Sequence, residues 1–378
     1  MSSHRLAVIA SYFAVFFGAG VWVPYFPLYL THLGFPGWQI GVVIGVQPAL
    51  RWGAALGWAY AADRWRIRHR VLVVTATTGM LFFVPLLVVR DFAAILAVLT
   101  MIGLLHGTLI PMLDATVMDH LARLGGNYGR LRLWGSIGFV VGSVVSAPLT
   151  HAFSVGVVPL LLLLPGFALV PALVRLPREQ LGHRERFQAP WRLLTPPLAA
   201  FLCAGFLLQL SCGAFGGFFA VHTTALGFSD AVPGITFGLA VTAEVALLYW
   251  GRQVVERVSA PHLIILTLLI TIGRWALTAI VHTETWVIAL QLGHVFSFSV
   301  FHLAALRLLS HLVPPQSSTG GQALYGLVSY GIGSSAGLAL AGTLVDRVGT
   351  SALFGIEAVV CIVALVPALQ LRRMMRAA

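Results

Sequence analysis

The sequence predicts an all-α integral membrane protein, with twelve transmembrane helices in two pseudo-symmetric six-helix bundles. Composition is the first observation behind this prediction: of the 378 residues, 58% are hydrophobic and only 9% are charged, and the mean hydropathy is +0.92. Single water-soluble domains do not grow a core large enough to bury so much apolar surface. We therefore expect the chain to lie in a lipid bilayer.

An internal repeat is the second observation, because a shift of 193 positions aligns the chain with itself without a gap. Leu-Gly-Phe at 33–35 falls on the same three residues at 226–228, and Asp63-Arg64 falls on Glu256-Arg257. Further matches pair Gly41 with Gly234, Gly45 with Gly238, Ser136 with Ser329, Gly138 with Gly331, and Asp91 with Glu284. Two halves with hydrophobic spans in the same order are typical of secondary transporters.

Apolar stretches of about 20 residues, the length of a membrane-crossing helix, set the expected spans. They lie at 7–31, 38–60, 71–89, 92–121, 131–153 and 155–174, and then at 198–222, 232–250, 262–281, 285–312, 321–345 and 350–371. The domains that follow are an N-terminal six-helix bundle (1–174), a cytoplasmic linker (175–196) and a C-terminal six-helix bundle (197–378).

Arginines predict the orientation of the spans. They gather after the second and fourth spans, in the linker, after the eighth span and at the C-terminus, whereas the opposite loops hold little beyond Arg90 and Arg347. By the positive-inside rule, both termini and the linker are cytoplasmic. The first span continues without a cleavage site, so it is expected to be retained. Because the net charge of +11 is split among short loops, we expect no nucleic-acid partner.

Cofactor chemistry has no support in the sequence. Cys203, Cys212 and Cys361 lie within spans without CxxC spacing, and no metal-ligand set is evident. A phosphate-binding GxxxxGK[ST] loop is absent. We expect no cofactor and no enzyme activity, since no nucleophile and base or metal cluster has a suitable spacing. An ion gradient is the expected energy source.

Charged residues inside spans are the strongest functional candidates, because each costs several kcal/mol unless it faces protein or water. The candidates are Arg51, Asp114, Glu244, Arg274 and Arg307, with Arg132 opening the fifth span and His294 and His302 in the tenth. Under the shift, Arg51 falls on Glu244 and Asp114 on Arg307, so opposite charges hold equivalent places. Static ion pairs and, for Arg307, an interfacial position are the structural alternatives.

These residues resemble a known family. The run from Tyr128 to Phe139 (YGRLRLWGSIGF) is similar to the start of helix 5 in the lactose permease, nucleoside symporter and phenylpropionate permease cluster of the major facilitator superfamily. The second half looks like the phenylpropionate permease branch, through Ala243-Glu244, Arg274-Trp275, His294, the 302–307 run His-Leu-Ala-Ala-x-Arg, and Gln322-Ala323-x-Tyr325. The resemblance covers about residues 5–370.

The resemblance implies a set of site residues. Substrate binding is expected at Asp114, Arg132, Arg274, Trp275, His294, Gln322 and Tyr325. Proton coupling is expected at Glu244, His294 and Asp114. Ser297 stands at the position of the acid that carries the coupled proton in lactose permease, so the carrier differs here. A proton-driven monomer in a bacterial inner membrane is implied as well.

Gating is expected at the loop between spans 2 and 3 and at its repeat. Asp63-Arg64 keeps the core of the superfamily's signature in that loop, and Glu256-Arg257 is its counterpart. Such residues cap and cross-link helix ends in one conformation and release them in the other. A similar run, Gly342 to Gly349, lies on the outer side, where it is an extracellular latch or only a tight turn.

The expected function is alternating-access transport, with proton-coupled symport of a small organic solute such as an aromatic carboxylate. Arg132 or Arg274 would bind the carboxylate and aromatic side chains would receive the ring. A sugar or nucleoside symporter remains an alternative, using Asp114, Gln322 and Tyr325 with hydroxyl groups. An efflux antiporter would have the same architecture. A membrane-embedded enzyme is a third alternative, for which no suitable spacing stands out, and a sensor without transport is a further one.

Overall fold

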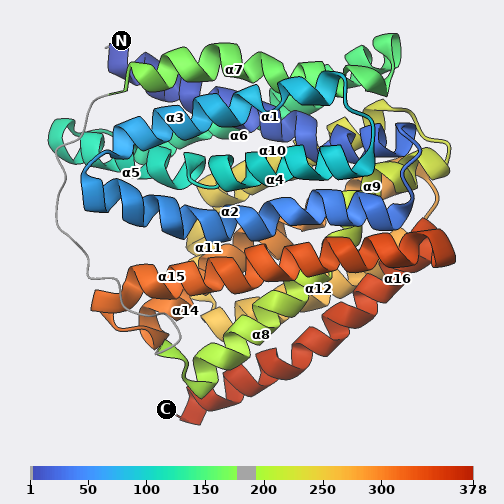
Figure 1. Cartoon of the computed structure of the whole chain (residues 1–378). Helices are drawn as coiled ribbons and strands as arrows, with labels where there is room; N and C mark the ends of the chain where they lie inside the picture. Colours follow the sequence, from blue (N-terminus) through green and yellow to red (C-terminus); the bar gives the residue numbers. More distant parts are fainter. Residues whose placement is uncertain (1–2, 177–192, 378) are drawn as a thin grey trace. The chain divides into compact units, whose positions relative to one another are not determined.

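The computed structural model describes residues 3–176 and 193–377, and these residues form helices and connecting turns with no β-strand among them (Figure 1). Most of the predicted linker, residues 177–192, lies outside the described part of the chain. The predicted all-α membrane fold is confirmed.

Long apolar helices fill the first half of the chain, and Pro inside several of them is consistent with membrane helices, which tolerate Pro better than soluble ones do. The helices are α1 (Ser3–His32), α2 (Gly37–Trp65), α3 (Arg68–Leu81), α4 (Phe92–His106), α5 (Leu109–Leu124), α6 (Tyr128–Phe153) and α7 (Val158–Val174).

The second half has more interruptions. Its helices are α8 (Pro196–Leu210), α9 (Gly213–Ala225), α10 (Ala231–Ala246), α11 (Arg252–Arg257), α12 (Ala260–Ile280), α13 (Glu284–Leu290), α14 (Phe301–Leu312), α15 (Ser318–Tyr325) and α16 (Ser334–Ala377). The described residues include three π-helical segments, Leu247–Gly251, Phe296–Val300 and Gly326–Gly333, and each interrupts the helix of one span. Such segments occur often at functional sites.

Eleven stretches of the described residues are long and apolar enough to cross a membrane. The last, Gly320–Arg376, has 57 residues, which is enough for two crossings. Gly349 breaks its helix with a φ of 77°. This break accounts for the difference between eleven stretches and twelve predicted spans.

The internal repeat appears in the backbone as two matching helix ends. Gly34 and Gly227 have φ of 81° and 77°, the left-handed region that glycine favours. The residues that follow donate matching hydrogen bonds, Phe35 N–H to Leu30 O at 3.2 Å and Phe228 N–H to Thr223 O at 3.0 Å. Each half therefore closes a helix with the same glycine-dependent cap.

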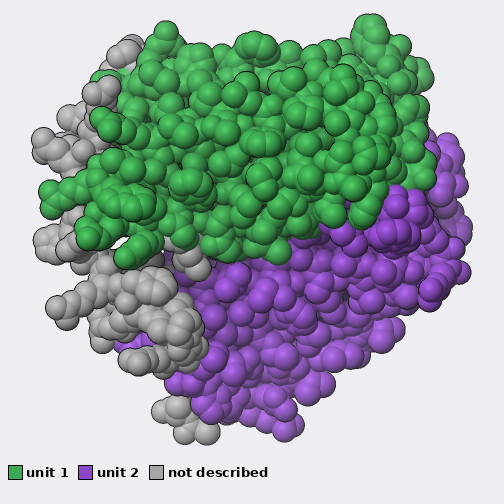
Figure 2. Space-filling view, viewed as in Figure 1, with its two compact units in different colours: residues 1–35, 46–184, 233–238 green, residues 36–45, 185–232, 239–378 purple. Residues whose placement is uncertain are grey.

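Contacts divide the chain into two compact units (Figure 2). The first contains residues 1–35, 46–184 and 233–238, and the second contains 36–45, 185–232 and 239–378. These units are defined by contacts between residues, which do not show where the chain crosses a membrane. The predicted domain boundaries, 1–174, 175–196 and 197–378, therefore stay a prediction.

Glycines set the close packing of α1 on α6 in the first unit. A Cβ added at Gly138 would meet the backbone of Phe13, and one added at Gly142 would meet the backbone of Phe17. Small residues let helix backbones approach in a bilayer, where apolar burial gives little drive for association. This packing brings the inner face of α1, with Tyr12 and Phe16, against α6.

The second unit packs α8, α9 and α12 against α16. The turn between α8 and α9 lies against α16, because a Cβ added at Gly213 would meet the backbone of Gly337, and one at Gly337 would meet that of Leu210. The span Pro196–Ala225 is therefore bent at Ser211 and Cys212, which separate its two helices. The bend places the N-terminus of α9 inside the protein.

Candidate functional site

In the first unit, Asp114 of α5 and Arg132 of α6 lie together. Arg132 Nε is 3.9 Å from Asp114 Oδ1, and both side chains are about 30% exposed. Tyr12 of α1 donates its hydroxyl proton to the same carboxylate oxygen at 2.5 Å. The structure thus places the two predicted residues within ion-pair reach, in a cluster that solvent can enter.

Aromatic rings hold the Arg132 guanidinium in place. Its central carbon lies 4.1 Å from the centre of the Phe16 ring and 5.4 Å from that of Tyr12, at cation–π distances. Gly135 gives it room, because a Cβ there would lie 2.8 Å from Arg132 Nη1 and 2.9 Å from the Phe16 ring. The cluster can bind a hydroxyl group through Asp114 or an anion through Arg132.

In the second unit, Glu244 of α10 faces His294. Glu244 Oε1 is 3.2 Å from His294 Nε2, and the pair is mostly buried. On the other side of the imidazole, Nδ1 lies 3.4 Å from the Ser297 hydroxyl. The two ring nitrogens therefore face a carboxylate and a hydroxyl, an arrangement in which an imidazole can pass a proton.

Arg274 of α12 continues this chain of polar groups. Its Nη1 donates to Ser297 Oγ at 2.9 Å, and its Nε donates to Gln291 Oε1 at 2.8 Å. Gln291 in turn donates to Thr278 Oγ1 at 3.1 Å. Glu244, His294, Ser297, Arg274 and Gln291 thus form one continuous polar path through the second unit.

The Arg274 guanidinium is buried without a direct carboxylate partner among the described residues. Only 3% of the residue is exposed, and its hydrogen-bond partners among the described residues are a hydroxyl and an amide. Its Nη2 has no hydrogen-bond partner within the described chain. Its carbon lies 4.4 Å from the Phe215 ring centre and 4.0 Å from that of Trp275. A buried cation with a spare donor is suited to an anionic ligand.

The remaining predicted binding residues are not all part of this path. Trp275 is fully buried, between Phe215 and Phe354. Tyr325 is buried and donates its hydroxyl proton to the Tyr330 hydroxyl at 3.2 Å. Gln322 is exposed, and among the described residues its side chain reaches Ser318 of its own helix, at 3.5 Å. Trp275 therefore supports Arg274, while Tyr325 and Gln322 lie outside the polar path.

Of the predicted gating residues, Arg64 and Arg257 are exposed at the ends of α2 and α11. The side chains of Asp63 and Glu256 lie outside the described part of the structure. Close by in sequence, Arg68 at the start of α3 pairs with Asp119 of α5 at 2.9 Å. This pair links two helices at the arginine-rich end of the first unit.

Two functional candidates were missed from the sequence. In the sequence Ser297 stands out only as the residue in place of an acid, yet in the structure it joins His294 to Arg274. Glu357 of α16 is 4% exposed, its Oε1 accepts the Ala214 N–H at 2.9 Å, and its Oε2 has no partner among the described residues. The rule that singled out charged residues inside spans would have found Glu357, since it lies within the predicted span 350–371.

Comparison with known proteins identifies the family. The model of the MFS_1 like family matches residues 6–356. The chain belongs to this family. It is therefore a multi-pass membrane transporter of the major facilitator superfamily and not an enzyme. The predicted superfamily and its secondary-transport function are confirmed.

Two relatives of the chain are named for different solutes. The chain is 28% identical over 305 residues to the "probable 3-phenylpropionic acid transporter" of Escherichia coli K12, covering 79% of this chain and 80% of the relative. It is 26% identical over 346 residues to the maltose permease of Geobacillus stearothermophilus, covering 89% and 86%. The first relative agrees with the predicted branch.

Solved structures share the fold at low identity. The nucleoside transporter NupG aligns with a TM-score of 0.81 at 17% identity, covering 99% of each chain. A bacterial homologue of the human lysosomal transporter Spinster aligns with a TM-score of 0.77 at 13% identity, covering 98% of this chain and 97% of that one. These likenesses establish the fold alone.

Proposed function

We propose that this transporter couples the movement of a small aromatic carboxylate to that of a proton, as a symporter. Arg274 carries the proposal, because it is a buried guanidinium with neutral partners, a spare N–H donor and two flanking aromatic rings. A carboxylate would supply the missing negative charge and accept from Nη2. The ring of the same substrate would pack against aromatic side chains.

The proton is carried, in this proposal, by the Glu244–His294 pair. Glu244 can be charged against a protonated His294 or neutral beside a neutral imidazole, and the 3.2 Å separation suits both states. An anion bound at Arg274 would act on His294 through Ser297, which lies within 3.4 Å of the ring. Substrate charge and proton occupancy are thereby linked through one hydroxyl.

In the first unit, Asp114, Arg132 and Tyr12 form the second group that would bind substrate. Both side chains are partly exposed, so a ligand can reach them. Their 3.9 Å separation is long for an ion pair, so either residue can leave the other to bind a ligand. Arg132 could take the carboxylate in place of Arg274. Asp114 could also hold a proton while the substrate occupies Arg132.

A sugar or nucleoside symporter is the second candidate function. The maltose permease relative and the fold likeness to the nucleoside transporter favour it, and Asp114 can accept hydrogen bonds from hydroxyl groups. An efflux antiporter is compatible with the same residues, and only the direction of proton-linked flux separates it from a symporter.

A thermal-shift screen on the purified chain tests the proposal. We expect 3-phenylpropionate to raise Tm, and 3-phenylpropanol, which has the same ring without the carboxylate, to leave it unchanged. Arg274→Gln should abolish the shift, while Arg347→Gln, an exposed arginine far along the sequence, should keep it. A shift with maltose or a nucleoside alone would instead support the second candidate. Counterflow in proteoliposomes then confirms that a bound ligand is transported.

We also propose that a monomer works in a bacterial inner membrane with both termini in the cytoplasm, with Asp63, Arg64, Glu256 and Arg257 gating at that side. The arginine-rich loops support this orientation. The test starts from a chain in which Cys203, Cys212 and Cys361 are replaced by serine. A single cysteine introduced at a position within 178–190 should then react with a membrane-impermeant maleimide only after the cells are opened. Labelling of intact cells would overturn the orientation.

A further inference from the structure

A basic pocket of about 360 Å³ lies where three helices of the second unit end. Its walls come from the start of α12, the end of α14 and the end of α16, and its basic lining residues are His262, Arg307, His311, Arg372 and Arg376. Because these helix ends border apolar spans, we expect the pocket to lie at the depth where the hydrocarbon gives way to lipid headgroups.

The positive charge of the basic pocket is not balanced by described acids. Its lining has three arginines and two histidines but no Asp or Glu, and within the described side chains none of the five forms an ion pair. Arg307 is held by backbone carbonyls, donating from Nη1 to Val258 O at 2.9 Å and to Val255 O at 3.3 Å. Carbonyls fix the guanidinium in place and leave its charge available to an anion.

The N-terminus of α12 adds to this positive field. The helix has 21 residues, and Ser259 at its N-cap makes no side-chain cap. Instead, the Ser259 hydroxyl lies 2.6 Å from His262 Nδ1 within the pocket. Ser259 thus leaves the first N–H groups of the helix uncapped, apart from Pro261, which has none, and the partial positive charge of the helix end reinforces the arginines.

Two apolar stripes run from the basic pocket along the helices that form it. On α12, Leu266 and Leu269 follow His262 at spacings of four and three residues, and they are 42% and 52% exposed. On α16, Ile362, Val366 and Leu369 precede Arg372 at the same spacings, and each is at least 41% exposed. Spacings of three and four residues keep side chains on one helix face. The basic pocket therefore opens onto apolar surface suited to acyl chains.

We propose that the basic pocket binds the phosphate-bearing headgroup of an anionic phospholipid. Arg372 and Arg376 contact the phosphate, Arg307 lies behind it, and the acyl chains lie along the stripes of α12 and α16. A free phosphate or a soluble phosphorylated molecule would use the same arginines, but it would have no need of the apolar stripes. Basic pockets between helices at a membrane face are suited to anionic lipids.

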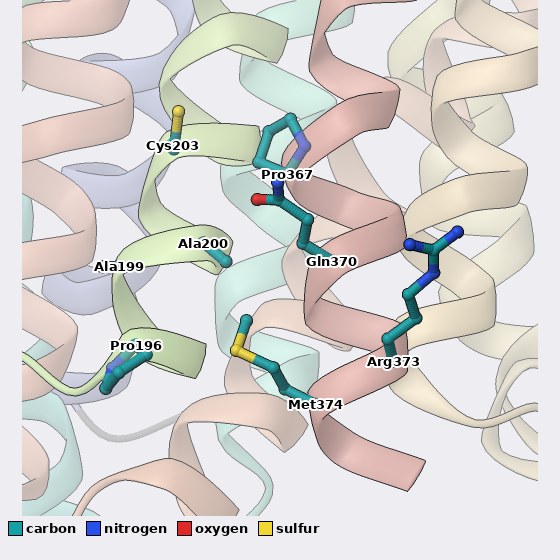
Figure 3. Close-up of a pocket in the computed structure, with 8 residues that line it drawn as sticks. All are labelled: Pro196, Ala199, Ala200, Cys203, Pro367, Gln370, Arg373 and Met374. Atoms are coloured by element: carbon teal, nitrogen blue, oxygen red, sulfur yellow. The ribbon is translucent and has the colours of Figure 1, made fainter. Parts of the chain in front are cut away.

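The next residue along α16 supplies a matched control. Arg373 lines a different pocket, of about 530 Å³, formed with α8 residues such as Pro196 and Ala200 (Figure 3). That pocket has one arginine, and its other lining residues are uncharged. Arg373→Gln therefore removes the same charge from the same helix end without touching the basic pocket.

The test uses the purified full-length chain in a neutral detergent, titrated with phosphatidylglycerol, phosphatidylcholine or inorganic phosphate, with Tm as the readout. We expect phosphatidylglycerol to raise Tm at lower concentration than phosphatidylcholine does. One arginine near an anionic lipid surface raises the binding affinity about fivefold. The double variant Arg372→Gln with Arg376→Gln should therefore bind phosphatidylglycerol with an affinity lower by roughly 25-fold. Arg373→Gln should lower the affinity for phosphatidylglycerol by less than about fivefold.

Three outcomes would overturn the proposal. The affinity for phosphatidylglycerol could fall equally in the double variant and in Arg373→Gln, or the two lipids could raise Tm equally. Inorganic phosphate alone could also raise Tm as much as phosphatidylglycerol does, with this effect lost in the double variant. The last would assign the basic pocket to a soluble anion. Native mass spectrometry of the wild-type chain tests the proposal even if the double variant does not fold. It should show retained phosphatidylglycerol that excess phosphatidylcholine fails to displace, and its complete absence would contradict the proposal.

Discussion

His294 Nε2 lies 3.2 Å from Glu244 Oε1, on a ring whose other nitrogen faces the Ser297 hydroxyl at 3.4 Å. The imidazole therefore stands between the only carboxylate of this polar path, among the described residues, and the hydroxyl that binds Arg274. A proton on the Glu244–His294 pair and an anion at Arg274 can therefore interact through this short connection.

Neutralising Glu244 should separate proton coupling from substrate movement. Glu244→Gln is expected to abolish proton-driven accumulation in proteoliposomes and to leave exchange of substrate across the membrane largely intact, because the amide resembles the protonated acid. Glu284→Gln is the control, since Glu284 is exposed at the start of α13. Unchanged uphill transport by Glu244→Gln would exclude Glu244 as the coupling group.

Asp114 and Arg132 should act as a pair in the first unit. At 3.9 Å and about 30% exposure, their mutual stabilisation is expected to be about 1 kcal/mol in a double-mutant cycle of unfolding, far less than for a fully buried pair. Asp114→Asn and Arg132→Gln should each lower substrate affinity, and the double variant should bind no better. A coupling energy near zero together with normal binding in the double variant would show that the pair has no role.

Much of the fold was accessible from the sequence because it depends on local rules. Gly34 and Gly227 match under the repeat, and both end a helix in the left-handed conformation. Asp91 and Glu284 also match, and each begins a helix: Asp91 caps α4 by accepting the Ala94 N–H at 2.9 Å, and Glu284 lies in the first turn of α13. Repeated residues thus marked repeated helix ends.

The site was less accessible because it depends on side-chain reach between distant helices. Charge inside the spans predicted Asp114, Arg132, Glu244, Arg274 and His294, and the structure brings the first two together and joins the other three in one path. Nothing in the residue types indicated the π-helical segment Phe296–Val300, which contains Ser297. The resemblance singled out Ser297 as the replacement of an acid, but its contacts with His294 and Arg274 depend on neighbours in space that the sequence does not give.

Within the second unit, α2 packs closely against α16. Substituting alanine at two glycines of α2 should therefore change the free energy of unfolding in opposite directions. A Cβ added at Gly41 would meet Leu338 O, and it would lie 2.9 Å from Gly342 Cα, so both neighbours are backbone and cannot move aside. Gly37 nearby donates its N–H to Asp346 Oδ2 at 2.7 Å, which fixes the same contact. Gly41→Ala should cost about 1–3 kcal/mol through overpacking.

Gly57 of the same helix is the matched control, since an added Cβ there has nothing within 4 Å. Gly57→Ala should stabilise the chain by about 0.5–1 kcal/mol, because alanine favours the helix. Thermal unfolding in detergent measures both changes. If Gly41→Ala proves as stable as Gly57→Ala, the contact between Gly41 and Gly342 does not form in solution.

Glu357 should act as a buried helix cap. Its Oε1 accepts the Ala214 N–H at the start of α9, where the bend at Ser211 and Cys212 leaves N–H groups inside the protein. Glu357→Gln keeps this acceptor, so its free energy of unfolding should fall by no more than about 1 kcal/mol. Glu357→Ala loses the cap and leaves a cavity, and should cost about 2–4 kcal/mol.

Transport separates this capping role from a second proton site. If Glu357 only caps α9, the Glu357→Gln chain should accumulate substrate with the proton gradient as the wild type does, per molecule of folded protein, in contrast to Glu244→Gln. A Glu357→Gln chain that folds and exchanges substrate but no longer accumulates it would contradict a purely structural role. Because Glu357 Oε2 is buried without a partner among the described residues, that result would make this carboxylate the bearer of a transported proton.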